Sequence, residues 1–382
     1  MKLAGKGLAQ GLLIVICAYS VVAARADNTP PNSYVVTTLT SDMPGVSPHV
    51  DSVLQNPWGI AFSPDGGLFW IADNATGCAT VYGGRGTAAA LQVAIPLPGN
   101  VVPNTSCRKV DPKNPPNNAA PTGIVWNPSA AFLVPGTISQ ATFIFSTEDG
   151  TLAAWAGGPI YSSSNAVIAA NNSKRGAVYK GLAFGVNLHG PFLFATNFNA
   201  GTIDVFGPNG SNGKFTPATT DGGFADPNLP AGYAPFGIQN IDGNLFVTYA
   251  KQDPAKKDDV PGPGNGFVDV FDTDGHLLRR FASAGPLNSP WGVARASYAF
   301  GRFVGQILIG NFGNGRINVF DSQGQFIDRL NNPAGTALKI DGLWALTLGS
   351  GHHSSPDTLY FTAGPNDEMN GLFGTITPAS KN

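Results

Sequence analysis

The sequence predicts an all-β protein built as a six-bladed β-propeller of four-stranded antiparallel blades. Three observations support this fold class. A short apolar strand that contains a glycine recurs six times, and further strand patterns follow each copy. The 382 residues include 49 glycines and 31 prolines, which divide the chain into many short segments. Only Glu148 and Glu368 are glutamates, and helix-forming residues are scarce beyond the N-terminus.

Residues 289–330 show the repeating unit best. The letters PWG open a first strand, and a second apolar strand is expected at residues 306–310. Residues 316–321 alternate apolar and polar side chains, as a half-buried strand does, and a turn leads to a fourth strand at residues 325–330. This order describes a four-stranded antiparallel meander, which is one propeller blade.

Six glycines mark the first strand of each unit, at spacings of 50 to 64 residues. They are Gly59, Gly123, Gly181, Gly237, Gly292 and Gly342. The last unit ends soon after its third strand, whereas Tyr34–Ser41 is a strand without a unit of its own. We therefore expect Tyr34–Ser41 to complete the sixth blade and to close the ring, which hides edge strands that would invite aggregation.

Residues 264–281 (GNGFVDVFDTDGHLLRRF) and 313–330 (GNGRINVFDSQGQFIDRL), with the PWG and PFG strand openings, resemble NHL-repeat six-bladed propellers. The resemblance covers nearly all of the chain after its N-terminal segment. Within this group, the sequence is similar to an uncharacterised family of exported bacterial proteins. The resemblance implies the fold and leaves the activity open, because propellers carry many unrelated functions.

The first 26 residues have the pattern of a signal peptide. Lys2 and Lys6 precede an apolar run, and Ala26 ends a small-residue cleavage site. We expect residues 27–382 to form one secreted or periplasmic propeller domain, which is a monomer without a membrane anchor. Cleavage would take the formal net charge from −2 to about −5, which does not favour nucleic-acid binding.

Cys78 and Cys107 remain after removal of the leader. An even pair in an exported chain predicts a disulfide, since that compartment is oxidising. Both cysteines fall in loops on one face of the ring, called the top face below. This face carries the loops between second and third strands and the connections between blades. The bond is expected to hold the insertion at residues 98–121 over the channel mouth, and two separate thiols are the alternative.

Polar residues at or near strand ends predict a ligand site at the top of the channel. They are Asp73, Glu148, Asn197, Tyr249, Asn311 and Asp341. Carboxylates and amides that converge on one axis suit an oxygen-preferring cation such as Ca²⁺, with Asp73, Glu148 and Asp341 as its ligands. The competing interpretation is that these residues cap turns through bonds to local backbone.

Three functions remain open at this point. The first is a non-enzymatic binding or scaffold module that takes a small molecule, polymer or protein on its top face. The second is a metal-dependent hydrolase or lyase that resembles gluconolactonase-like or streptogramin-lyase-like propellers, although no glutamate stands early in the first blade to hold the metal. The third is a component of an extracellular matrix. No GxSxG or HExxH motif supports an enzyme, so binding is preferred.

Overall fold

The computed structural model describes Met1 and residues 29–65, 67–99, 107–111, 113, 117–157, 163–349 and 354–379. The expected leader therefore lies outside the described residues, apart from Met1. The strands of residues 31–379 form six sheets, each with a four-stranded antiparallel blade, which confirms the predicted fold class. No helix in the described ranges is long and apolar enough to cross a membrane.

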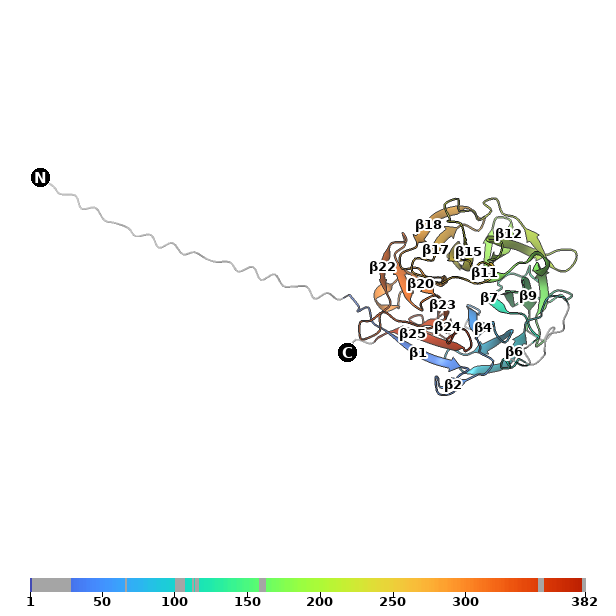
Figure 1. Ribbon diagram of the computed structural model, residues 1–382, viewed down its shortest axis with the longest axis horizontal. Helices are drawn as coiled ribbons and strands as arrows, with labels where there is room; N and C mark the ends of the chain where they lie inside the picture. The colour runs from blue at the N-terminus through green and yellow to red at the C-terminus, as the bar shows by residue number, and fades with distance from the viewer. Residues whose placement is uncertain are drawn as a thin grey trace. The chain divides into compact units, whose positions relative to one another are not determined.

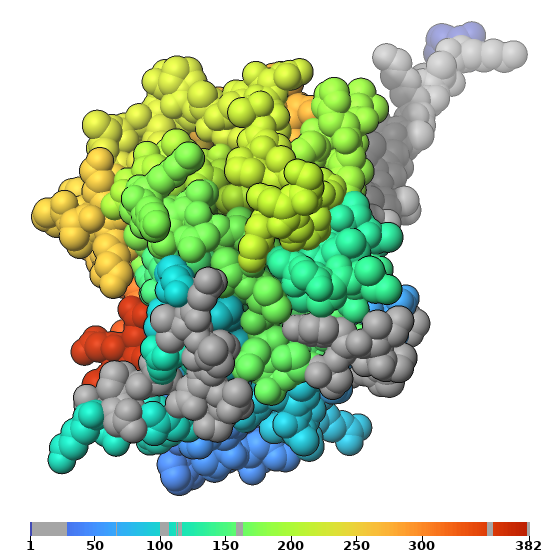
Figure 2. Space-filling view, turned by 90° about the vertical axis from the view of Figure 1, so that its right-hand side faces the viewer, coloured from blue at the N-terminus to red at the C-terminus, as the bar shows by residue number. Residues whose placement is uncertain are grey.

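The first three blades follow one another along the chain. Blade one contains β3 (Pro57–Ala61), β4 (Phe69–Asp73), β5 (Cys78–Tyr82) and β6 (Ala88–Ala94). Blade two contains β7 (Pro121–Trp126), β8 (Phe143–Thr147), β9 (Thr151–Trp155) and β10 (Val167–Asn171). Blade three contains β11 (Tyr179–Asn187), β12 (Gly190–Asn197), β13 (Thr202–Asn209) and β14 (Phe215–Ala218). The side view in Figure 2 shows these neighbouring segments in light blue to cyan, teal to green, and green to yellow-green.

The other three blades complete the ring in chain order. Blade four contains β15 (Tyr233–Ile241), β16 (Asn244–Lys251), β17 (Phe267–Phe271) and β18 (Leu277–Ser283). Blade five contains β19 (Pro290–Arg295), β20 (Ile307–Asn311), β21 (Ile317–Phe320) and β22 (Phe326–Arg329). Blade six contains β23 (Leu343–Leu348), β24 (Leu359–Ala363) and β25 (Leu372–Pro378), together with β1 (Tyr34–Ser41). Short 3₁₀ turns lie at Ser173–Arg175 and Gly301–Phe303.

The first strand of each blade is the innermost one, and these six strands contact one another in sequence around the axis. Figure 1 shows β7, β11, β15 and β23 near the centre of the ring, with β6, β18 and β22 nearer its rim. Glycine permits this close approach. A Cβ atom at Gly123 would lie 2.3 Å from the backbone nitrogen of Leu182, in the next blade. The recurring glycine therefore reflects crowding at the axis.

Blade six corrects one of the six predicted glycine positions. Gly342 precedes β23 and has a φ of +63°, so it belongs to the turn before the strand. Ala345 takes the repeat position instead. Its backbone N–H donates to Thr362 Oγ1 at 3.1 Å, as the N–H of Gly237 donates to Thr248 Oγ1 in blade four. Gly342 matches the repeat spacing, but its positive φ places it in the turn before the strand.

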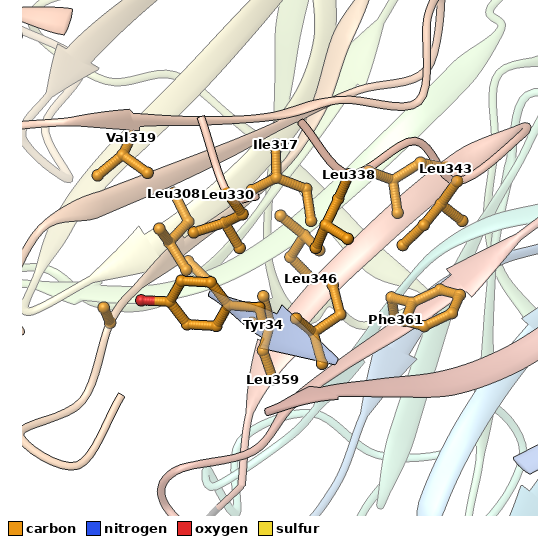
Figure 3. Packing of buried hydrophobic residues seen from close by; sticks show 14 of the residues in the cluster. Tyr34, Leu308, Ile317, Val319, Leu330, Leu338, Leu343, Leu346, Leu359 and Phe361 are labelled. Atoms are coloured by element: carbon orange, nitrogen blue, oxygen red, sulfur yellow. The ribbon is translucent and has the colours of Figure 1, made fainter. Parts of the chain in front are cut away.

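The N-terminal strand closes the ring as predicted. β1 pairs antiparallel with β25, with Tyr34 opposite Pro378 and Ser41 opposite Leu372. Tyr34 packs in the cluster between blades five and six, which also contains Leu308 and Leu359 (Figure 3). The sequence analysis did not anticipate β2 (His49–Val50), a two-residue strand parallel to β1.

Apolar clusters lie between neighbouring blades, because each blade buries both faces against its neighbours. Between blades one and two, Trp70 stacks on Phe143 at 4.3 Å between ring centroids and lies 4.7 Å from Trp155. Trp70 and Trp155 are therefore part of the core between blades.

The predicted disulfide is present between Cys78, at the start of β5, and Cys107. The bond lies close to the channel mouth, since residues 108–111 follow Cys107 and Val110 N donates to Gln55 Oε1 at 2.7 Å. Gln55 directly precedes Asn56, a residue of the mouth described below. The tip of the expected insertion, residues 100–106, lies outside the described residues.

Candidate functional site

The residue before the axial glycine or alanine places one side chain per blade at the top of the channel. These residues are Trp58, Thr122, Lys180, Phe236, Trp291 and Trp344. Four of the six are aromatic, and they form the axial plug with Phe198 and Phe312. Trp58 stacks on Trp344 with ring centroids 3.5 Å apart, and Phe312 stacks on the same Trp344 at 4.0 Å. The channel is thus closed by aromatic rings near its top face.

Lys180 is the one cation in this ring of positions, and its side chain is only 2% exposed. Its Nζ lies 5.1 Å from the ring centroid of Trp58 and 5.9 Å from that of Phe198, within the range of cation–π attraction. The same ammonium group forms ion pairs with Glu148 and, at 3.1 Å, with Asp258. A buried lysine is therefore neutralised by carboxylates from blades two and four.

The charges of this pair reinforce each other. Burial alone would lower the pKa of Lys180, but the carboxylates of Glu148 and Asp258 outweigh burial and raise it. Burial alone would raise the pKa of Glu148, but Lys180 and a hydrogen bond from Asn74 hold it below its usual value. Both groups are consequently charged at neutral pH.

A chain of hydrogen bonds extends from this pair across blades one and six. Asn74 Nδ2 donates to Glu148 Oε2 at 3.0 Å, and Asn56 Nδ2 lies 3.3 Å from Asn74 Oδ1. Asn56 Nδ2 also donates to Glu368 Oε2 at 2.6 Å. We call Asn56, Asn74, Glu148, Lys180, Asp258 and Glu368 the mouth network. It rests on the plug, because Trp344 Nε1 donates to Asn56 Oδ1 at 3.0 Å.

Glu368 lies on an unusual turn. Asn366, Asp367 and Glu368 have φ values of 58°, 53° and 63°, three consecutive non-glycine residues in the left-handed region. Such conformations cost on the order of 1 kcal/mol or more each and are found mostly where the surroundings impose them. Asp341 helps to hold the turn, since its Oδ2 accepts from Asn366 N at 3.1 Å. The strained backbone therefore belongs to the turn that carries the Glu368 carboxylate.

Burial raises the pKa of Glu368 to about 7, and the hydrogen bond from Asn56 opposes this only in part. The nearby charge of Glu148 raises it further. The only two glutamates of the chain thus meet through two asparagines, yet their pKa values move in opposite directions.

A hollow of about 330 Å³ opens beside Glu368 on the top face, and we call it the mouth hollow. Its acidic lining residues are Asp341, Asp367 and Glu368, and Phe312 of the plug supplies an aromatic wall. Glycines at 313, 342 and 364 complete much of the remaining surface. The hollow is therefore acidic, with an aromatic face at one side.

Of the six sequence-predicted site residues, Glu148 lies at the centre of the mouth network and Asp341 lines the mouth hollow. Asp73 does not join them. It is fully buried in blade one, where its Oδ2 accepts from Thr80 at 2.7 Å, and burial raises its pKa well above the usual range. The neighbouring Asn74 lies in the turn after β4 and reaches the mouth instead.

The other three residues serve their own blades. Asn197 Oδ1 accepts from Ala200 N at 3.3 Å, and Asn311 Nδ2 donates to Pro286 O at 2.9 Å. Tyr249 is 3% exposed and lies beside Asp269 inside blade four. For Asn197 and Asn311 the competing interpretation, bonding to nearby backbone, describes the geometry.

The expected Ca²⁺ ligands do not converge. Asp73 is bonded within its blade and Glu148 is paired with Lys180, while Asp341 bonds the turn before Glu368. Across the described ranges, no three His, Cys, Asp or Glu side chains are grouped so that they could hold a metal ion. These residues therefore do not fit a calcium site of the kind predicted from the sequence.

Sequence reasoning missed Asn56, Lys180, Asp258 and Glu368. A signal for Lys180 was present, since the letters YKG stand where other blades have PWG or PFG. A charged residue in an otherwise aromatic repeat position is a candidate for a site at the axis. Glu368 carried a weaker signal, as one of only two glutamates in the chain.

No family model matches the chain. Two mimivirus proteins (Acanthamoeba polyphaga mimivirus) are similar over most of its length. Uncharacterized protein R648 is 31% identical over 92% of this chain and 81% of its own, and Uncharacterized protein L690 is 32% identical over 90% and 86%. These relatives are viral, whereas the sequence analysis expected a bacterial family.

A solved structure, the apo-form of a soluble aldose sugar dehydrogenase from Escherichia coli, shares the fold. It is 14% identical, with a TM-score of 0.50 over 91% of this chain and all of the other. At this identity the likeness supports the propeller architecture and carries no information about activity.

Proposed function

This chain belongs to the protein family that includes the uncharacterised mimivirus proteins R648 and L690, and we propose that it is a binding propeller whose mouth hollow takes a small organic cation. The observation that carries the proposal is the lining of the hollow, which Asp341, Asp367 and Glu368 share with Phe312. Carboxylates with an aromatic face recognise alkylammonium groups through charge and cation–π attraction.

The neighbouring lysine does not oppose this charge preference. Lys180 is held by Glu148 and Asp258, so its positive charge is compensated within the mouth network. An organic cation is favoured over a metal ion, since the carboxylates are not grouped to coordinate one centre. The diffuse charge of an alkylammonium group requires less exact ligand geometry than Ca²⁺ does.

A thermal-shift series tests the proposal with butylammonium, tetramethylammonium, Ca²⁺ and uncharged 1-butanol. We expect stabilisation by one or both organic cations and none by 1-butanol, because binding to the folded state alone raises the melting temperature. Glu368→Gln and Asp341→Asn should reduce the shift. Asp242→Asn is the matched control, as this exposed carboxylate pairs with Arg295 away from the mouth. Equal shifts in all variants, or none in the wild type, would reject the proposal.

The measurement with Ca²⁺ separately tests the calcium site predicted from the sequence. The sequence-based calcium prediction gains support if Ca²⁺ stabilises the wild type and Asp341→Asn removes the effect. Stabilisation by Ca²⁺ alone would replace the organic-cation proposal with that metal.

A second candidate function is a hydrolase or lyase of the propeller type named above. It is favoured by one observation, the divergent pKa values of Glu148 and Glu368, since acid–base catalysts often pair carboxyl groups in this way. Hydrolysis of a small lactone, assayed with and without added divalent metal, tests it. Turnover that Glu368→Gln abolishes would support catalysis, and equal rates with and without protein would reject it for this substrate class.

Export also remains part of the proposal. The apolar leader pattern and the disulfide support it, because structural disulfides persist in oxidising compartments. N-terminal sequencing of protein recovered from the periplasm or medium of an expressing bacterium should find a chain that begins at Asp27. Recovery of only the uncleaved chain from the cytoplasm would contradict export.

A further inference from the structure

A separate cavity lies at the end of the channel opposite the mouth, and we call it the axial cavity. It has a volume of about 380 Å³ and is lined by the ends of inner strands from blades one, two, three, four and six. A narrower hollow of about 60 Å³ continues from the same strands toward Trp291, on the underside of the axial plug. The plug thus separates this cavity from the mouth hollow.

The lining of the axial cavity contains no ionisable side chain among the described residues that form it. Its walls include Ile60, Phe62, Trp126, Leu182 and Phe184. A charged occupant would lose its hydration here without gaining a counter-charge, which is costly. The lining therefore selects an uncharged molecule.

A purely apolar occupant is also disfavoured. Each inner strand is hydrogen-bonded to a neighbour on one side only, so the polar backbone groups on its free edge face the axis. Covering those groups with hydrocarbon would leave them without water or another partner. The occupant needs donors and acceptors at its edges as well as apolar faces.

Gln239 supplies an adaptable polar side chain at this site. It lines both the axial cavity and its narrower continuation, and the side chain is exposed. Its one described hydrogen bond, from Nε2 to Asn240 O, is long at 3.5 Å. The neighbouring Asn240 is already used, since it donates to Phe184 O at 2.9 Å and accepts from Gly243 N at 2.9 Å. Gln239 is thus the side-chain amide available to a ligand.

We propose that the axial cavity binds an uncharged, planar heteroaromatic molecule of two or three fused rings. Its faces pack against the side chains of Trp126 and Leu182, and its edge groups bond to strand backbone and to Gln239. The volume lies in the usual range for small-molecule sites, about 300–1,000 Å³. This site is independent of the cation site at the mouth, because it lies at the other end of the channel and has no charged lining.

The test uses three probes, adenine, quinoxaline and lumichrome, with ligand-observed NMR and calorimetry on the folded chain. At least one probe should bind saturably with a Kd below about 1 mM. Gln239→Trp fills the cavity from an exposed position and should weaken binding at least ~10-fold. Gln323→Trp is the matched control, since this exposed glutamine lies in a turn of blade five.

The outcomes separate this site from the mouth. Glu368→Gln should leave the binding of the heteroaromatic probes unchanged, and Gln239→Trp should leave organic-cation binding unchanged. The proposal is overturned if none of the three probes binds with a Kd below about 1 mM. It is also overturned if Gln239→Trp binds as the wild type does, or if benzoate or benzylammonium competes for the site as strongly as the uncharged probes.

Discussion

At the scale of the residue, the site depends on one substitution within a repeat. Lys180 occupies a position that is aromatic in four of the six blades, and this brings a cation onto the axis. Because Lys180 is almost fully buried, the carboxylates of Glu148 and Asp258 must converge on it. The mouth network is built around this need to pair the buried Lys180 with carboxylates.

Lys180→Met should lower the free energy of unfolding by about 3–5 kcal/mol, because it leaves the buried carboxylate of Glu148 without its partner. The double variant Lys180→Met/Glu148→Gln should recover part of the loss, and a denaturant titration measures both. Arg295→Met is the control, since its pair with Asp242 is exposed and should be worth less than about 1 kcal/mol. Equal effects of Lys180→Met and Arg295→Met would contradict a structural role for the buried pair.

Glu368 predicts a dependence of stability on pH. Its folded pKa of about 7 is above the reference value of 4.5, so the folded state holds a proton that the unfolded state releases in this window. The contribution of Glu368 is full below pH 4.5 and is lost as pH rises to about 7. The stability of the wild type should therefore fall relative to Glu368→Gln between these values and run parallel above them. Parallel curves throughout would show that the Glu368 pKa is unshifted.

At the scale of the element, the closing strand was predictable and most of the site was not. The incomplete last repeat and the unassigned strand Tyr34–Ser41 both appear in the local pattern, so their pairing could be inferred. The composition of the mouth network depends on the direction in which individual side chains point. Asp73 and Asn74 are adjacent, yet one is buried in its blade and the other bonds Glu148. A strand pattern alone did not tell which of the two reaches the axis.

Deleting residues 27–41 should lower the free energy of unfolding by several kcal/mol, because blade six loses its outer strand and the buried Tyr34. Tyr34→Phe removes only the hydroxyl group that donates to Phe300 O, and should cost about 1 kcal/mol. Thermal unfolding compares the two. An unchanged melting temperature after the deletion would mean that β1 is not needed for closure.

Replacing both Cys78 and Cys107 by serine should cost roughly 3–4 kcal/mol in the chain-entropy model for a loop of this length. Denaturant titration of the oxidised wild type and the double variant gives the difference. Peptide mapping of the non-reduced protein is the control for the bond itself. Two freely alkylatable thiols in protein recovered from an oxidising compartment would contradict the bond.

At the scale of the whole molecule, the ring gives the two ends of its channel different chemistry. The aromatic plug separates an acidic hollow at the mouth from an uncharged cavity at the opposite end. The repeat made the ring predictable, because each blade satisfies the same spacing. The axial plug and the mouth network were not predictable, because they form where side chains from all six blades meet.

The central claim is that the mouth hollow binds an organic cation. A crystal soaked with 2-bromoethylammonium and measured at the bromine absorption edge locates such a ligand directly. The account predicts an anomalous peak in the mouth hollow between Phe312 and the carboxylates of Asp341 and Glu368, and no such peak in Glu368→Gln crystals. Bromine peaks only at other sites, or equal peaks in both proteins, would contradict it.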